Sequence, residues 1–184
     1  DWSSDVCSSD LEKVAEKGHK TEEAINTIDE KLTRYLITLS SEALSQKESE
    51  VLTNILDSSR DLERIGDHAE ALININDYLQ RKNVQFSNSA LEELEDIYRQ
   101  TSEFVKDALE SVENNDLEMA ESLIERHEAI NKMERVLRKT HIKRLNNGEC
   151  STQAGVNFID IISHYTRVSD HAMNLAEKVL AEQI

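Results

Sequence analysis

Apolar positions along most of the chain follow the spacing of amphipathic helices. They recur every three or four residues through five stretches, 21–40, 46–81, 90–112, 116–145 and 152–182. In the first stretch the apolar side chains are Ile25, Ile28, Leu32, Tyr35, Leu36 and Leu39. We therefore predict five helices. We place a break at Gly18, with Thr21 as the N-cap of the first full helix.

Residues that favour helix ends lie at the predicted boundaries. Ser45 and Glu48 have the spacing of a capping box, in which each residue satisfies a backbone N–H group of the other. Ser87 or Ser89 precedes the third helix, and Ser151 precedes the last. Gly148 follows the fourth helix, where a left-handed residue commonly ends a helix. These short connections predict helices that run antiparallel to their neighbours.

Two parts of the chain resemble each other in the same order. Residues 25–29 (INTID) reappear as residues 130–134 (INKME), and residues 64–69 (RIGDHA) reappear as residues 167–172 (RVSDHA). The offset is 105 residues for the first pair and 103 for the second. Ser45 and Ser151 precede the helices that carry the second pair. The near-constant offset predicts a duplicated helical unit.

The composition agrees with helices and narrows the range of functions. The 184 residues include no proline and only four glycines, whereas sheet proteins rely on both in their turns. A formal net charge of −16 would repel nucleic-acid phosphates, so we expect no nucleic-acid partner. No run of 18 apolar residues occurs. Two cysteines, Cys7 and Cys150, are too few for a disulfide framework and fit a reducing cytoplasm.

The repeat also defines the expected domains. Residues 1–11 (DWSSDVCSSDL) are serine-rich and lack the helical spacing, so we interpret them as a non-native segment and the chain as a fragment. Residues 12–82 would form a first bundle that lacks its N-terminal helix, and residues 88–184 a complete second bundle. The predicted fold is all-α, with two tandem three-helix bundles of the up-down, spectrin-like kind.

Glu63 and Asp67 are the strongest candidates for chemistry. Their i,i+4 spacing puts both carboxylates on one helix face, where they can bind a hard or borderline cation. Such pairs arise often in so acidic a chain, so the hypothesis depends on the repetition of Asp-His-Ala at residues 67–69 and 170–172. The alternative is a solvated face, with Arg64 and Arg167 as ion-pair partners of the aspartates.

Other polar residues carry weaker signals. Four histidines lack ligand-like spacing and are expected at the surface or with ordinary hydrogen-bond partners: His19, His127, His141 and His164. Cys150 precedes a helix N-terminus, but no His–Cys pair is apparent, so we interpret it as a structural or neutral thiol. No nucleophile elbow, Gly-rich phosphate loop, HExxH or CxxC motif occurs. We therefore do not expect an enzyme.

The string at residues 61–69 (DLERIGDHA) resembles the signature of the PhoU family, and residues 165–177 (YTRVSDHAMNLAE) fit the same string. Residues 140–150 (THIKRLNNGEC), Phe86-Ser87 and the helix start at 90–94 are similar to the C-terminal PhoU-like region of bacterial sodium/phosphate cotransporter family proteins. The resemblance covers residues 21–182. It implies two three-helix bundles side by side, with metal clusters that commonly contain iron or another divalent or trivalent metal.

Carried onto this chain, the resemblance implies that Glu63, Asp67 and Asp170 are the metal ligands. Thr166 stands where the family often has Glu or Asp, and a threonine supplies no carboxylate. Ala71 stands where the second copy has Asn174. We therefore expect the second site to bind metal weakly or not at all.

The resemblance also implies a function. It indicates a cytoplasmic regulatory domain of a sodium-dependent phosphate transporter, at the inner membrane as part of an integral membrane protein. The partner would be the membrane-embedded transporter domain of the same polypeptide, and a homodimer is left open. The alternative is a free-standing PhoU-type accessory protein that acts on an ABC phosphate transporter and a sensor kinase. A plain structural bundle and a metal-dependent enzyme are further alternatives; the enzyme lacks the Glu-x-x-His pairs of helical carboxylate sites.

Overall fold

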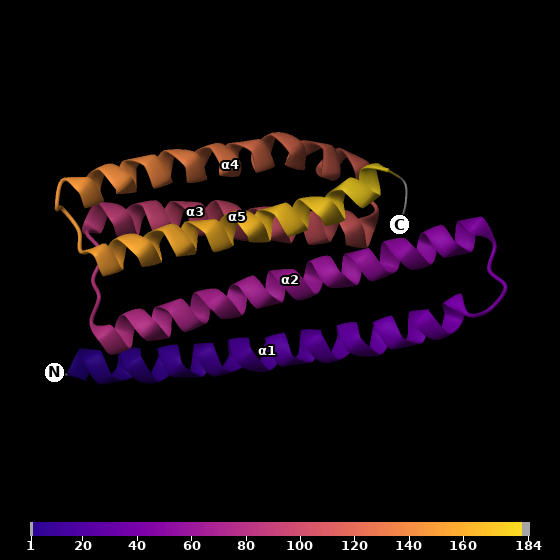
Figure 1. The fold of residues 1–184 in the computed structure, drawn as a ribbon, viewed down its shortest axis with the longest axis horizontal. Coiled ribbons are helices and arrows are strands. Elements are labelled where there is room, and N and C mark those ends of the chain that lie inside the picture. The colour runs from indigo at the N-terminus through magenta and orange to yellow at the C-terminus, as the bar shows by residue number, and fades with distance from the viewer. Residues whose placement is uncertain (1, 182–184) are drawn as a thin grey trace.

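The protein folds into long helices that run antiparallel to their sequence neighbours (Figure 1). The computed structural model describes residues 2–181, and the side chains from residue 12 onward. The helices are α1 (Trp2–Ser40), α2 (Gln46–Lys82), α3 (Asn88–Asn114), α4 (Leu117–Asn146) and α5 (Thr152–Leu180). Residues 2–181 contain no strand. The predicted all-α fold is confirmed.

Hydrogen bonds at the helix ends confirm the predicted caps. The Ser45 N–H donates to Glu48 Oε2 at 2.8 Å, and the Glu48 N–H donates to Ser45 Oγ at 3.3 Å. Ser87 and Ser151 each accept a hydrogen bond from the backbone N–H three residues later. Gly148 has a φ of 72°, a left-handed conformation that glycine adopts without a steric cost. Local sequence therefore determines where most of the helices begin and end.

The predicted break at Gly18 is wrong, because α1 continues through this residue. Thr21 is not an N-cap either, since its hydroxyl donates to the Lys17 carbonyl one turn earlier, at 2.9 Å. A β-carbon on Gly18 would overlap with Cδ1 of Ile73 in α2. Gly18 thus allows α1 and α2 to approach closely, and packing between these helices outweighs its low helix propensity.

The second half of the chain forms a closed three-helix bundle. Helices α3, α4 and α5 each pack against the other two. One core cluster takes fully buried side chains from all three helices: Phe104, Ala108, Ala120, Leu123, Ala172 and Ala176. A second cluster, at the end of the bundle where α5 begins, is built around Ile97, Leu137 and Phe158. The bundle is therefore closed by apolar contacts along its length.

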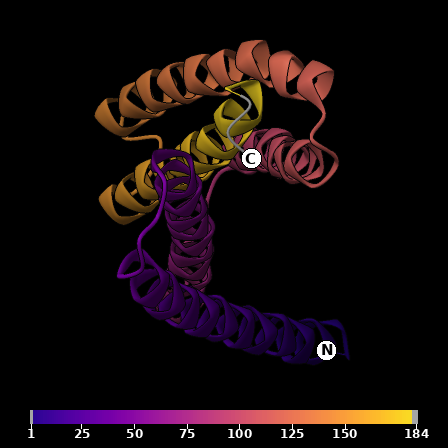
Figure 2. The same ribbon diagram turned by 90° about the vertical axis from the view of Figure 1, so that its right-hand side faces the viewer.

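The first half is an antiparallel hairpin with an uncovered side. Within residues 2–181, α1 packs only against α2, which lies between α1 and the bundle (Figure 2). Three large apolar side chains of α1 and α2 are exposed, Ile28 by 62%, Ile55 by 40% and Leu62 by 41%. They line a groove of about 930 Å³. Phe158 stands at the repeat position of Ile55 but is fully buried beside α3. The equivalent helix face is therefore covered by a third helix in the second half and uncovered in the first.

Two predictions about domains are not decided by this architecture. The division into residues 12–82 and 88–184 stays a prediction, as does the interpretation of residues 1–11 as non-native. Helix α1 begins at Trp2, and residues 1 and 182–184 lie outside the described range. Among the described residues, none of the helices has the length and apolar character needed to cross a membrane.

Candidate functional site

The two copies of the Asp-His-Ala motif meet where α2 packs against α5. His68 Nδ1 lies 3.1 Å from His164 Nδ1, and His171 Nδ1 donates a hydrogen bond to Asp61 Oδ1 at 2.9 Å. His68 and His171 are 103 residues apart, as are Asp61 and His164. The same contact is therefore made twice, with the roles of the two helices exchanged. We infer that α2 and α5 pack as equivalent helices about an approximate two-fold axis.

The histidine contact is neutral. Burial, aided by the positive charge of Arg167 and by the neighbouring rings of His164 and His171, lowers the pKa of His68 to about 4. Burial also lowers the pKa of His164. At neutral pH both rings are therefore uncharged, and one Nδ1–H donates to the other Nδ1. The His171 ring stacks on His68 with centroids 5.7 Å apart, so three histidines share the interface.

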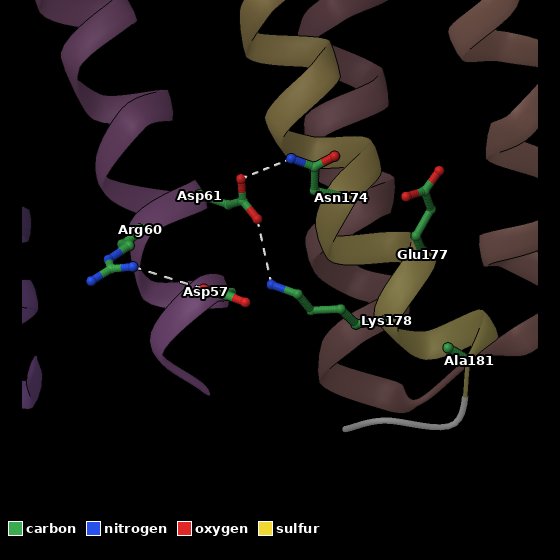
Figure 3. A pocket seen from close by; sticks show the side chains of 7 residues that line it. All are labelled: Asp57, Arg60, Asp61, Asn174, Glu177, Lys178 and Ala181. Atoms are coloured by element: carbon green, nitrogen blue, oxygen red, sulfur yellow. Dashed lines mark hydrogen bonds and ion pairs between the residues drawn. The ribbon is translucent and has the colours of Figure 1, made fainter. Parts of the chain in front are cut away.

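The second contact centres on Asp61, a carboxylate that is only 8% exposed. Besides His171, Asn174 donates to Oδ1 at 2.9 Å, and Lys178 Nζ lies 3.4 Å from Oδ2 (Figure 3). Lys178 also donates to Ser58 at 3.1 Å. These donors all come from α5, and the carboxylate comes from α2. Asp61 therefore fixes the position of the first half of the chain against the second.

A pocket of about 570 Å³ opens beside this network (Figure 3). Its charged lining residues are Asp57, Arg60, Asp61, Glu177 and Lys178. Three of these are acids and two are bases, and Lys178 is already paired with Asp61. The pocket therefore has no excess of positive charge with which to hold a phosphate ion.

Glu63 lies on the side of α2 that faces α1, and Asp67 lies one turn later on the same helix. A β-carbon on Gly66 would lie 3.4 Å from Ile25 Cδ1, so the two helices approach closely at this level. Burial, together with the negative charges of Asp67, Asp29 and Glu22, raises the pKa of the Glu63 carboxyl. The candidate pair therefore belongs to an acidic cluster contributed by two helices, which we call the α1–α2 acidic cluster: Glu22, Asp29, Glu63 and Asp67.

The equivalent place in the second half, between α4 and α5, has different chemistry. His127 Nε2 lies 2.8 Å from Asp170 Oδ1, and His127 stands at the repeat position of Glu22. The Thr166 hydroxyl donates to the Ile162 carbonyl at 3.0 Å. Two carboxylates of the α1–α2 acidic cluster are thus replaced by an imidazole and a hydroxyl. Asp170 lies apart from Glu63 and Asp67, because it faces α4 rather than α1.

The donor set of the α1–α2 acidic cluster suits a hard cation, since oxygen ligands from carboxylates are what such ions prefer. The raised pKa of Glu63 is consistent with a cation site, because a bound cation would relieve the repulsion among these acids. Of the side chains that the structure describes, however, no three His, Cys, Asp or Glu groups converge as metal ligands do. A bound cation would therefore require the carboxylates to rotate toward one another. At the equivalent place in the second half, Thr166 supplies no carboxylate beside Asp170, so weak or no metal binding there stays a prediction.

Two of the remaining histidines have the ordinary partners expected of them, whereas His141 is buried and its Nδ1 has no hydrogen-bond partner. His19 lies 2.8 Å from Glu70, and His127 is paired with Asp170.

The sequence did not reveal the roles of Asp61 and His164 at the interface. A signal for them did exist, because a 103-residue offset relates Asp61 to His164 as it relates His68 to His171. The sequence could also not show that His141 reaches Cys150, which the structure places 3.8 Å apart, Nε2 to Sγ.

This fold, with a repeated motif that joins its two halves, is that of a PhoU-type helical protein. The chain belongs to the PhoU domain family, which matches residues 4–75 and 94–179. The resemblance drawn from residues 61–69 is thereby confirmed.

Three individual members of the family are similar to this chain over most of its length. The chain is 30% identical over 172 residues to the phosphate-specific transport system accessory protein PhoU homolog 1 of Thermotoga maritima, covering 91% of this chain and 70% of that protein. The crystal structure of the phosphate transport system regulatory protein PhoU from Streptococcus pneumoniae is similar at 23% identity, with a TM-score of 0.77 over 95% of this chain and 81% of that one. PhoU from Pseudomonas aeruginosa is similar at 20% identity, with a TM-score of 0.83 over 94% and 83%. The two structures establish the fold.

The Thermotoga maritima relative is named as an accessory protein and the Streptococcus pneumoniae one as a regulatory protein, in agreement with the non-enzymatic prediction. None of the three is named as a part of a sodium/phosphate cotransporter.

Proposed function

We propose that this protein regulates phosphate transport as an accessory protein, through contacts with a phosphate transport system. The observation that carries the proposal is the PhoU match across both halves of the chain. The Thermotoga maritima relative is named as an accessory protein of a phosphate-specific transport system, which supports the free-standing form of this function. The net charge of −16 favours a partner with a basic contact surface.

A second candidate is the regulatory domain of a sodium-dependent phosphate transporter. Its support is the similarity of residues 140–150 and of Phe86-Ser87 to the C-terminal region of such proteins. Both candidates regulate phosphate uptake. They differ in the transporter that the helices contact, and therefore in the ion or nucleotide that drives the regulated flux.

Phosphate uptake by cells tests the proposal and separates the two candidates. The coding region is deleted in the source cell, and uptake of labelled phosphate is measured at low and at high external phosphate, with sodium present or replaced by choline. We expect deletion to change uptake, and re-expression of the deleted region in its natural place to restore it. If the changed flux does not need sodium, an ABC-type system is the target; if it does, the cotransporter is. Unchanged uptake at both phosphate concentrations would reject regulation of transport altogether.

We also propose that the α1–α2 acidic cluster binds a metal ion, with Glu63 and Asp67 as its central ligands. Iron is the metal that the family resemblance implies, and carboxylate oxygens suit it. When bound, the cation would supply positive charge that neutralises the acids between α1 and α2. Glu63 and Asp67 would hold it from α2, and Asp29 and Glu22 would face it from α1. In this proposal the metal ion has a structural role, because it would join α1 to α2.

A further inference from the structure

A histidine and a cysteine meet at the turn between α4 and α5. His141, near the end of α4, is 2% exposed, and its ring stacks on Phe158 with centroids 4.0 Å apart and an interplanar angle of 6°. Its Nε2 lies 3.8 Å from Sγ of Cys150, which is half-buried. Its Nδ1 is buried and has no hydrogen-bond partner. The ring is thus fixed by stacking and aimed at the thiol.

The unpartnered Nδ1 indicates which nitrogen carries the proton. A neutral imidazole has one N–H donor and one bare acceptor nitrogen. A buried N–H without an acceptor is rarer in proteins than an acceptor without a donor, because it costs more free energy. The proton therefore belongs on Nε2, where it can be donated to Cys150 Sγ. Burial and the positive charge of Arg144 lower the pKa of His141, which keeps the ring in this neutral form at neutral pH.

Two further features of this turn are positively charged or positively polarised. Cys150 directly precedes Ser151, the N-cap of α5, so it lies at the positive end of a 29-residue helix. Arg144 lies over the same Phe158 ring, with Cζ 5.7 Å from the centroid, where Glu93 and Ser89 hold it. A hydrogen-bond donor and a helix N-terminus are surroundings in which reactive cysteines are found.

We propose that Cys150 is a modification site, a nucleophilic thiol that His141 activates and that peroxides oxidise. A sulfur lone pair attacks one oxygen of hydrogen peroxide, an S–O bond forms and the O–O bond breaks. The sulfur attacks as the thiolate, and the proton that it released returns through solvent to the leaving hydroxide, which departs as water. Cys150 becomes a sulfenic acid and the peroxide is reduced to water, so atoms and electrons balance.

The surroundings of Cys150 give this reaction a structural consequence. A β-carbon on Gly155 would lie 3.0 Å from Leu145 Cδ1 and 3.7 Å from His141 Nε2, so the space on the inner side of the turn is filled. An oxygen added on the inner side of Sγ would meet His141, whose Nε2 lies 3.8 Å from the sulfur. Oxidation is expected to loosen the turn between α4 and α5 and to expose Phe158.

The first test measures the rate at which Cys150 is alkylated. In a Cys7→Ser background, iodoacetamide is added at pH 7 to the native chain and to the same chain unfolded in urea. We expect the native thiol to react at least about fivefold faster, although it is half-buried, because only in the folded chain does His141 Nε2 lie within hydrogen-bond distance of its sulfur. A native rate equal to or below the unfolded rate would overturn the proposal.

A second variant separates activation from exposure. His141→Phe keeps a flat ring on Phe158 and removes the donor, and circular dichroism shows whether it folds. In a folded His141→Phe chain the alkylation rate should fall to about that of the unfolded chain, and dimedone should no longer trap a sulfenic acid on Cys150 after peroxide treatment. An unchanged rate in this folded variant would also overturn the proposal. If the variant fails to fold, the comparison of alkylation rates in the native and unfolded chains still tests whether the folded site activates Cys150.

Discussion

His171 of α5 donates a hydrogen bond to Asp61 of α2 at 2.9 Å, and the residues 103 positions away from each, His68 and His164, make the equivalent contact at 3.1 Å. The two contacts differ in charge. The histidine pair is neutral, whereas Asp61 is a carboxylate that also accepts from Asn174 and Lys178. Duplication thus left an interface that is symmetric in position and asymmetric in electrostatics, with the stronger contact on the Asp61 side.

Replacement of Asp61 by alanine should lower the free energy of unfolding by about 3 kcal/mol, because it leaves Lys178 and His171 without their acceptor in a nearly buried site. Urea unfolding followed by circular dichroism measures this change. Asp57→Ala is the matched control, since Asp57 pairs with Arg60 at 3.9 Å on the surface and should matter by less than about 0.5 kcal/mol. Equal effects of the two substitutions would show that Asp61 does not hold α2 to α5.

The two halves should respond differently to the same truncation. Phe158→Ala is expected to cost about 3–5 kcal/mol, because this side chain is fully buried in the second core cluster. Ile55→Ala at the equivalent repeat position should cost less than about 1 kcal/mol, because 40% of Ile55 is exposed. Denaturant unfolding of both variants checks the difference. A large loss for Ile55→Ala would mean that its face of α2 is covered in solution.

Metal binding should depend on α2 and not on α5. The chain is incubated with ferric or manganous ions, freed of excess metal, and analysed by elemental mass spectrometry. We expect the double variant Glu63→Gln, Asp67→Asn to lose the bound ion, because the remaining acids of the cluster lie on α1. Asp170→Asn should retain it, because Asp170 is paired with His127 and has Thr166 beside it in place of an acid. Retention by the double variant, with loss in Asp170→Asn, would place the metal in the other half.

Tyr165 should make the fold sensitive to alkaline pH. Burial and the neighbouring Tyr98 raise its pKa from 10.0 to about 12. Above pH 10 the unfolded chain therefore loses this proton while the folded chain keeps it, so stability falls as the pH rises from 10 toward 12. The loss should approach about 2–3 kcal/mol and be absent in Tyr165→Phe. Tyr35→Phe, at a tyrosine that is 61% exposed, should behave like the parent chain in the same unfolding series. Identical pH profiles for all three proteins would contradict the shift.

Local chemistry explains which parts of the fold could be predicted. The capping box of Ser45, the caps at Ser87 and Ser151, and the left-handed Gly148 all follow from hydrogen bonds within four residues. The break at Gly18 failed because its reason lies elsewhere, in the close approach of Ile73 on another helix. Helix propensity is a weak force next to such packing.

The sequence repeat predicted only part of the candidate site. Glu63 and Asp67 could be recognised as a pair on one helix face, but their cluster with Asp29 depends on how α1 and α2 are aligned. The contact between His141 and Cys150 depends likewise on the shape of the turn after α4. Apolar spacing identifies the face of a helix that is buried, but it leaves open which residue of the neighbouring helix lies opposite.

The single neighbour of α1 has a consequence for local motion. Within the described residues, α1 touches only α2, whereas α5 is surrounded by α2, α3 and α4. Separating α1 from the rest therefore breaks one helix contact and leaves the three-helix bundle whole. Amide protons of α1 should exchange with deuterium through a small local opening, well before those of α5, which require the cooperative unfolding of the bundle.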